Sequence, residues 1–347
     1  MKRTCLFFLL IFLMFFQTSC ISSSPYRNDP VKESRFMLNT VIEITLYEKE
    51  KDARAVFDDL FDEIKKYENK FSRHVPESEI SEANNNAGKP VTVSDETVEI
   101  IRSSLLFSDI SEGLFDISIG PLIDLWDING NNPRLPSENE IENALEKVDY
   151  NNIKINYENN TLFLSKEGMS LDLGAIAKGY ITDRLVEYLS RTNIRSAMLN
   201  LGGNLYLHGS KPDGSLWQIG IRDPYGSKGN YIGIIQVKNM SVVTSGIYER
   251  YFEIENKRYH HILNPRTGYP EDNNLASVSI ICPSSTMADG LSTTAFLLGP
   301  DKGMELVESL ENTEAIFITK DKKVILSSGI KNGNIPFNAT DKTFEVE

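Results

Sequence analysis

The chain has 347 residues, enough for one large domain or two ordinary domains with a buried core. It carries 36 Lys and Arg residues against 49 Asp and Glu residues, so its net charge is -13. A surface this acidic repels phosphate backbones. This argues against a nucleic-acid partner and means that any anionic ligand must be met by a local cation or a metal ion.

Residues 1–19 have the order of an export signal. Lys2 and Arg3 precede an apolar run that is too short to span a bilayer. Cys20 follows small residues where such a signal is cleaved, so we predict that its thiol is lipidated and that the protein is a lipoprotein. Gln17 is not the usual apolar residue of that motif, which leaves simple cleavage and release open. The expected location is a bacterial membrane surface, facing the periplasm or the cell exterior.

Low-complexity residues after Cys20 resemble a flexible tether, which we place at residues 20–34, and the predicted folded domain covers residues 35–347. Cys5 would leave with the signal and Cys20 would carry lipid. Cys282 would then have no partner for an internal disulfide, and its apolar surroundings predict a buried small hydrophobe rather than a nucleophile.

Periodicity predicts a strand packed on a helix at the start of the domain. In chain order, the elements predicted for the first half are a strand over residues 37–46, a helix over 52–71, a polar loop over 72–90 and a helix over 95–110. Glycines and a proline then surround Asp116 between residues 113 and 121, a pattern of tight backbone placement near a ligand.

The second half of the chain is mostly strands. A turn-rich insertion over residues 129–136, a hairpin over 153–164 and a helix over 174–191 precede strands predicted at 197–201, 205–209, 217–221, 231–237, 241–244, 251–254, 276–281 and 315–318. Helices mixed with largely adjacent strands predict an α+β domain. No G-x-G-x-x-G follows a first strand to favour a Rossmann unit, and Leu201-Gly-Gly-Asn204 alone is weak evidence for a phosphate loop.

Asp289 and Thr293 lie four residues apart in a segment whose apolar positions recur at helical spacing. Positions i and i+4 share a helix face, so the carboxylate and the hydroxyl can offer hard oxygen ligands to one cation. Taken alone, the pair could equally be an acid near a helix start and a buried hydroxyl with only structural roles.

A second segment, Asp172-Leu-Gly-Ala-Ile-Ala-Lys178, also has residues that bind charged oxygen. A glycine-flanked turn before a helix can leave the carbonyl of Ala175 free as a further hard ligand, and Lys178 can reach an anionic group. Mg²⁺ with few protein ligands keeps positions open for phosphate oxygens and water.

His261 begins a third segment, which closes with Asn264-Pro-Arg-Thr-Gly-Tyr-Pro270. The turn residues suit a side chain whose position must be well defined, although a single His is more often a hydrogen-bonded structural residue than a catalyst. In an extended segment the neighbouring His260 would point the opposite way, so the two are not expected to act together.

Five segments of the chain resemble those of ApbE-type FAD:protein FMN transferases. They are the segments described above that begin at Asp172, Leu201 and His261, together with Thr244-Ser-Gly-Ile-Tyr-Glu-Arg-Tyr-Phe and Ala288-Asp-Gly-Leu-Ser-Thr-Thr. The resemblance runs from about Arg35 to Gly299. It implies an exported, Mg²⁺-dependent enzyme with a single T-fold-related α+β domain, a mixed and largely antiparallel sheet and flanking helices. Such enzymes cleave FAD, place FMN on a Thr or Ser of an exported or membrane redox protein, and release AMP.

The resemblance also implies roles for individual residues. The metal site falls on Ala175, Asp289 and Thr293, with Ser292 at a position that is acidic in some relatives. His261 is the candidate general base, because an unperturbed imidazole titrates near working pH. Contacts to the flavin substrate are expected at Met37, His74, Leu114, Phe115, Asp116, Asp172, Lys178, His261 and Ile262. His74 stands where relatives often have Tyr, and an imidazole stacks on a flavin ring more weakly.

Two other functions stay open at this point. With water as the acceptor, the same site would be a Mg²⁺-dependent FAD pyrophosphatase that yields FMN and AMP. A flavin-binding lipoprotein without catalysis would bind FAD and leave it intact.

Overall fold

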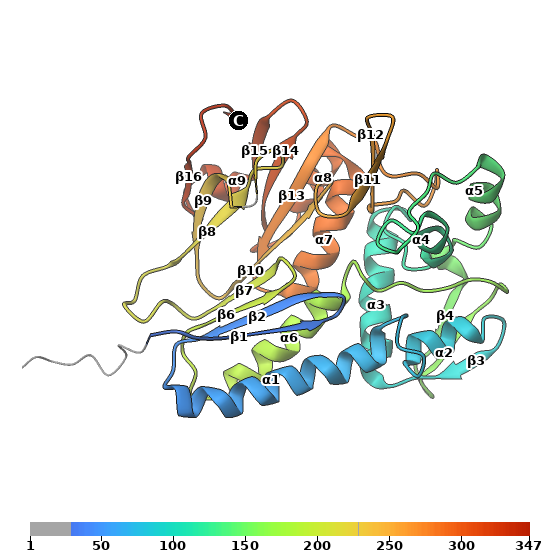
Figure 1. Ribbon diagram of the computed structural model, residues 1–347, viewed down its shortest axis with the longest axis horizontal. Helices are drawn as coiled ribbons and strands as arrows, with labels where there is room; N and C mark the ends of the chain where they lie inside the picture. Colours follow the sequence, from blue (N-terminus) through green and yellow to red (C-terminus); the bar gives the residue numbers. More distant parts are fainter. Residues whose placement is uncertain (1–28, 228) are drawn as a thin grey trace, which may run out of the picture.

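A nine-stranded sheet forms the centre of the computed structural model, which describes residues 29–227 and 229–347 (Figure 1). Neighbouring strands are antiparallel except β15 and β17, which are parallel. The predicted α+β fold with a mixed, largely antiparallel sheet is confirmed. In spatial order the strands are β1 (Val31–Met37), β2 (Thr40–Leu46), β6 (Ala197–Leu201), β7 (Asn204–His208), β10 (Met240–Gly246), β13 (Leu275–Cys282), β14 (Glu314–Thr319), β15 (Lys323–Leu326) and β17 (Glu345–Val346).

Helices pack against this sheet and bury the apolar stripes that the sequence predicts. In α1 (Glu50–Phe71), Ala53, Phe57 and Leu60 are at most 1% exposed, so this face of the helix forms the core with the strands. Figure 1 shows α1 and α6 (Ala177–Ser190) running below β1, β2 and β6. The four helices are α1 (Glu50–Phe71), α6 (Ala177–Ser190), α7 (Ser285–Leu298) and α8 (Pro300–Glu308).

α6 and α7 approach each other closely at Gly179. A Cβ atom added to Gly179 would lie 2.3 Å from the carbonyl oxygen of Ser285 and 2.6 Å from Cβ of Asp289. Only glycine allows this contact, because a side chain would collide with the backbone of the neighbouring helix. The contact places the first turn of α6 directly against Asp289.

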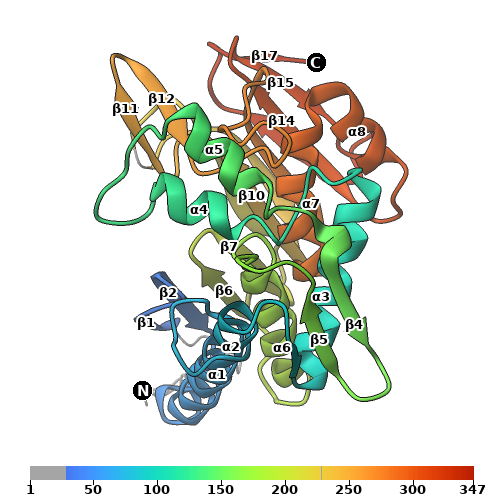
Figure 2. The ribbon, with the colours of Figure 1, turned by 90° about the vertical axis from the view of Figure 1, so that its right-hand side faces the viewer.

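The remaining elements form smaller groups around the main sheet. Figure 2 shows the β11–β12 hairpin beside α4 and α5, where Leu122, Trp126 and Tyr259 belong to a small separate core. The elements are a sheet of β3 (Pro90–Thr92), β5 (Thr161–Leu164) and β4 (Ile153–Asn156); a sheet of β16 (Phe337–Ala339), β9 (Tyr231–Val237) and β8 (Trp217–Arg222); the hairpin of β11 (Tyr251–Ile254) and β12 (Lys257–His260); and the helices α2 (Glu79–Asn85), α3 (Asp95–Ile110), α4 (Gly120–Trp126), α5 (Glu138–Leu145) and α9 (Ser328–Lys331), with a 3₁₀ turn at Tyr150–Asn152.

The predicted strand over residues 37–46 is instead a hairpin. β1 ends at Met37, and Leu38 and Asn39 form a turn with φ values of 52° and 55° before β2 begins. Two consecutive positive φ values are typical of a tight hairpin turn. Residues 31–34 therefore belong to the sheet and not to the predicted tether. The predicted signal, Cys20 and the tether up to residue 28 lie outside the described residues.

Two further predictions need correction. The loop predicted over residues 72–90 contains α2, whose first turn is capped by the Ser78 side chain. The helix predicted from residue 174 begins at Ala177, because the residues before it form a turn. Leu201-Gly-Gly-Asn204, which was weak evidence for a phosphate loop, is the tight β6–β7 turn, with φ values of 63° and 94° at Gly202 and Gly203.

α4, α5 and α8 were not predicted. Each has only seven to nine residues, too few for a convincing apolar period.

Cys282 is 2% exposed in β13, and burial raises the pKa of its thiol to about 12. A thiol with this pKa is almost fully protonated and a poor nucleophile at neutral pH, as predicted. Among the described helices, none combines the length and the apolar character that a membrane span requires.

Candidate functional site

Asp289 lies where α6 and α7 meet and is only 4% exposed. Its Oδ2 accepts a 2.8 Å hydrogen bond from the backbone N–H of Gly179. Its Oδ1 lies 3.5 Å from Nζ of Lys178, which also donates to the carbonyl oxygen of Gly174 at 3.1 Å. The carboxylate is thus buried beside one cation, with further capacity on Oδ1 to accept a ligand.

The hydrogen bond from Gly179 also affects Ala175. In a regular helix the N–H of residue 179 would bind the carbonyl four residues earlier, which belongs to Ala175. Here that N–H binds Asp289 instead, and within the described part of the chain no hydrogen bond to the Ala175 carbonyl oxygen is found. The predicted free carbonyl is therefore present in the turn before α6, four residues before the N–H that binds Asp289.

Hydroxyl groups complete this cluster. Thr293 is one helical turn from Asp289, and its Oγ1 lies 3.1 Å from Oγ of Ser245 at the end of β10. Ser245 also pairs with Ser292 at 2.8 Å, and the buried Ser292 hydroxyl donates to the carbonyl oxygen of Asp289 at 2.9 Å. Ser245 was not predicted as a site residue; only the tertiary contact between β10 and α7 identifies it.

A carboxylate, a carbonyl and a hydroxyl are ligands that suit a hard cation such as Mg²⁺. No group of three or more His, Cys, Asp or Glu residues that could hold a metal occurs in residues 29–227 and 229–347. A metal bound at Asp289 would therefore take several ligands from water or substrate oxygens. Mg²⁺ commonly binds in this way, so the residues present fit it.

Arg73 connects Asp172 to its surroundings and was missed in the sequence. Its guanidinium contacts Oδ2 of Asp124 at 2.6 Å, the carbonyl oxygen of Gly120 at 3.3 Å and Oδ2 of Asp172 at 3.6 Å. Oδ1 of Asp172 in turn accepts from the N–H of Gly174 at 2.7 Å, which shapes the turn before α6. His74, beside Arg73, is exposed.

Residues 114–116 lie beside this turn, since Ile117 accepts a hydrogen bond from the Asp172 N–H. Phe115 is buried against Phe107, and the Asp116 carboxylate accepts bonds from the Ser118 N–H, the Ser118 hydroxyl and the Tyr150 N–H. Burial raises the pKa of Asp116 to about 6. These two side chains therefore shape the loop, and their direct flavin contacts remain predictions, as does that of the partly buried Leu114.

His261 immediately follows β12 and lies next to Arg250. Its N–H donates to the carbonyl oxygen of Arg250 at 3.1 Å, and its Nδ1 lies 3.2 Å from the same oxygen. A carbonyl can only accept, so this contact places the imidazole proton on Nδ1 and leaves a lone pair on Nε2. The Arg250 guanidinium reaches the carbonyl oxygen of Asn39, which connects this segment to the turn after Met37.

The expectation that His261 titrates near working pH is wrong for the ligand-free protein. Burial, followed by the charges of Arg250, His260 and Lys178, lowers its pKa to about 3. The imidazole is therefore neutral at neutral pH, as a general base must be. An anion bound next to Arg250 and Lys178 would offset their positive charge and raise this pKa.

His260 points into the protein, as the alternation predicted, and has no place in the site. It is 5% exposed, its Nε2 lies 3.0 Å from the Glu271 carbonyl oxygen, and its ring packs edge-on against Phe296. Burial lowers its pKa to about 4, and its Nδ1 has no partner among the described residues. Ile262, with 5% exposure, is also a core residue.

We expect His260 to make the fold sensitive to acid. Its pKa is lower in the folded state than in the unfolded chain, where it is about 6.5, so the unfolded state binds more protons between those values. The free energy of unfolding therefore decreases as the pH falls from about 6.5 towards 4, and at pH 5 it is about 2 kcal/mol lower than at pH 7. Urea unfolding at pH 7 and pH 5 measures this loss, and His260→Gln should reduce it. An unchanged pH dependence in that variant would contradict the assignment.

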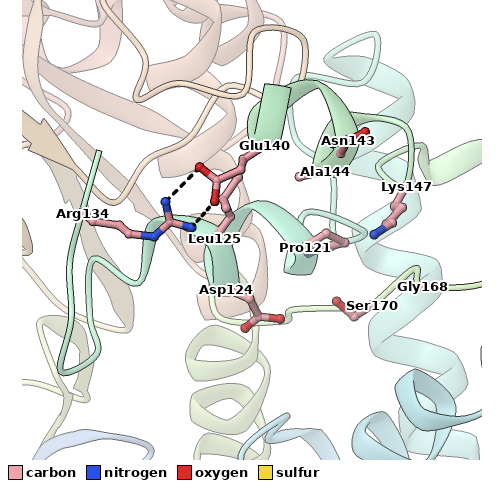
Figure 3. Close-up of a pocket in the computed structure, with 10 residues that line it drawn as sticks. All are labelled: Pro121, Asp124, Leu125, Arg134, Glu140, Asn143, Ala144, Lys147, Gly168 and Ser170. Carbon is pink, nitrogen blue, oxygen red and sulfur yellow. Dashed lines mark hydrogen bonds and ion pairs between the residues drawn. The ribbon is translucent and has the colours of Figure 1, made fainter. Parts of the chain in front are cut away.

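A polar depression of about 490 Å³ lies between α4, α5 and residues 168–170 (Figure 3). None of the predicted site residues lines it. Figure 3 shows that Arg134 directs both terminal nitrogens at Glu140, so these two charges neutralise each other. Asp124, which lines this depression, contacts Arg73, and Arg73 in turn lies 3.6 Å from Asp172. We assign the depression no role in the reaction.

The chain is similar to known proteins over most of its length. A model of the ApbE family matches residues 38–317. The chain is 37% identical over 314 residues to a FAD:protein FMN transferase of Klebsiella pneumoniae (strain 342), with 90% of this chain and 96% of the relative covered. It is 32% identical over 349 residues to a FAD:protein FMN transferase of Treponema pallidum (strain Nichols), with 95% and 96% covered.

Solved structures agree with these similarities. The ApbE protein of Thermotoga maritima superposes with a TM-score of 0.81 at 32% sequence identity, covering 88% of this chain and 99% of the other. The flavin transferase ApbE of Vibrio cholerae superposes with a TM-score of 0.78 at 26% identity, with the same coverage of both chains.

Proposed function

The chain belongs to the ApbE family and is a FAD:protein FMN transferase, and we propose that it performs this transfer with Mg²⁺ bound by Asp289, Thr293 and the carbonyl of Ala175. One observation carries the proposal: the Gly179 N–H binds the buried Asp289 carboxylate and so leaves the Ala175 carbonyl without the helical donor that it would otherwise have. Ser292 already has two hydrogen-bond partners, which favours a supporting role over metal ligation.

When bound, Mg²⁺ would neutralise charge on the diphosphate of FAD and on the departing AMP. Lys178 adds positive charge next to the same carboxylate. Phosphoryl transfer requires little covalent work from the protein, so positioning and electrostatic stabilisation are its main contributions.

His261 is the proposed general base. The hydroxyl oxygen of a Thr or Ser on the acceptor protein attacks the phosphorus of the FMN half, while the bond from that phosphorus to the bridging oxygen breaks. The hydroxyl proton passes to Nε2 of His261, which the Arg250 carbonyl keeps available. AMP then leaves with the bridging oxygen.

We also propose that the enzyme acts outside the cytoplasm, anchored through lipid on Cys20, and modifies an exported or membrane redox protein. The support is the order of Lys2, Arg3, the apolar run and Cys20 in the sequence. Mass spectrometry of the mature N-terminus from a membrane fraction checks this, and an unmodified or unprocessed N-terminus would contradict it.

One incubation tests the reaction and its metal. The protein is mixed with FAD, Mg²⁺ and an exported flavoprotein subunit, with EDTA replacing Mg²⁺ in a parallel sample. The expected result is FMN attached to a Thr or Ser of the denatured subunit, seen by mass spectrometry, with one AMP released per FMN attached and no product in EDTA. Free FMN without attachment would favour the pyrophosphatase alternative, and full transfer in EDTA would remove the metal assignment.

A further inference from the structure

Arg250 is an exposed cation beside the candidate base that has no acidic partner. Its guanidinium makes one contact, from Nη2 to the carbonyl oxygen of Asn39 at 3.4 Å. The adjacent Glu249 points to Arg222, at 2.9 Å, and so does not neutralise it. Within the described residues, no carboxylate lies within ion-pair distance of Arg250. In a chain with a net charge of -13, an arginine left unpaired in this way is available to an anionic ligand.

The hairpin places this guanidinium on the same side as the His261 imidazole. Tyr251 pairs with His260 at the start of the β11–β12 ladder, and the His261 N–H continues that ladder to the Arg250 carbonyl. Directly opposite residues of antiparallel strands project to the same face. The charges of Arg250 and Lys178 both contribute to the lowered pKa of His261, in agreement with this placement.

We propose that the Arg250 guanidinium binds the diphosphate of FAD next to His261. The diphosphate carries the negative charge of the dinucleotide, since its flavin and adenine rings are neutral. A guanidinium presents several N–H donors in one plane and matches phosphate oxygens better than an ammonium group does. This inference rests on the proposed function, because it assumes that FAD occupies this site.

Arg250 would then have two separate roles. Its backbone carbonyl sets the His261 tautomer. A substitution of the side chain at position 250 leaves this carbonyl in the chain. Its side chain binds phosphate and also contacts the turn after Met37. A side chain that only connected those two segments would affect every ligand of the site equally, whereas a phosphate-binding side chain would affect only ligands that carry phosphate.

Binding measurements with two ligands separate these possibilities. FAD and riboflavin, which lacks phosphate, are titrated into the wild-type protein, Arg250→Ala and Arg250→Lys, each with Mg²⁺ and with EDTA. The control is Arg258→Ala, which removes an arginine of the same hairpin that pairs with Glu253. Circular dichroism and thermal unfolding verify that each variant is folded.

We expect Arg250→Ala to weaken FAD binding by about 10- to 100-fold, the loss typical of a charge-assisted hydrogen bond, and to leave riboflavin binding unchanged. Arg250→Lys should recover part of the FAD affinity, and Arg258→Ala should match the wild type. Equal FAD binding by wild type and Arg250→Ala, or equal losses for both ligands, would overturn the inference alone. A wild-type protein that binds neither ligand would overturn the proposed function as well.

Discussion

Asp289→Ala is expected to abolish measurable FMN transfer and to weaken FAD binding in the presence of Mg²⁺. The substitution removes the only carboxylate of the proposed metal site. The metal ion bound there would neutralise negative charge on the diphosphate, which is a major part of the catalysis of phosphoryl transfer. We expect a loss of at least about 100-fold in the rate of transfer, because electrostatic stabilisation of this kind is worth several kcal/mol. The rate is measured as covalent flavin on the denatured acceptor protein.

A second variant separates loss of the metal from loss of the fold. Asp289 also accepts the Gly179 N–H, so alanine leaves a buried donor unpaired. Asp289→Asn retains an oxygen for that donor but not the negative charge, and should be folded and inactive. Asp301→Ala removes an exposed acid of α8 and serves as the control. Transfer at the wild-type rate by folded Asp289→Asn would remove Asp289 from the metal site.

His261→Ala is expected to bind FAD and to transfer FMN about 100- to 10,000-fold more slowly, the contribution typical of a general base. The imidazole would act on the acceptor hydroxyl in the transition state, so its loss lowers the rate of the chemical step more than the affinity for FAD. Single-turnover transfer from enzyme-bound FAD, followed with a fluorescence titration of FAD binding, measures the two effects separately.

His208→Ala is the matched control, since it removes an imidazole of β7 that contacts the Ile194 carbonyl away from the site. The pH profile adds a second criterion. A base works when it is unprotonated, so activity is lost as the pH falls through its pKa. With the His261 pKa lowered to about 3, kcat/KM should not show a loss centred near pH 6.5. An unchanged single-turnover rate in His261→Ala would exclude the proposed base.

Local patterns predicted much of the fold. The apolar stripe of α1 and the apolar runs of β9 and β13 were recognised from local side-chain patterns alone, because such patterns are set within a few residues. The hairpin turn at Leu38 and Asn39 was missed because the apolar alternation continues into β2 without a glycine. α4 and α5 were missed because their apolar residues face a small core shared with β12, which has no local signal.

The residues of the functional site also divide into those named from the sequence and those found only in the structure. Asp289, Thr293, Ala175, Lys178 and His261 were named from their motifs. Arg73, Ser245 and Arg250 were not, because each acts through partners distant in the chain. Arg73 contacts Asp172 and Asp124, and Ser245 contacts Thr293. The expected pKa of His261 was wrong because burial and neighbouring cations depend on packing.

The sequence by itself determined the chemical groups of this protein, the helices and strands that carry most of them, and the resemblance that names the reaction. The tertiary structure decided which of these groups meet. Asp289 and Gly179 are 110 positions apart in the sequence. Their contact requires α6 and α7 to approach so closely that position 179 has room only for the hydrogen atom of a glycine. The free Ala175 carbonyl and the His261 tautomer also follow from such contacts. Periodicity does not report them, since it records which face of an element is buried and not what lies opposite.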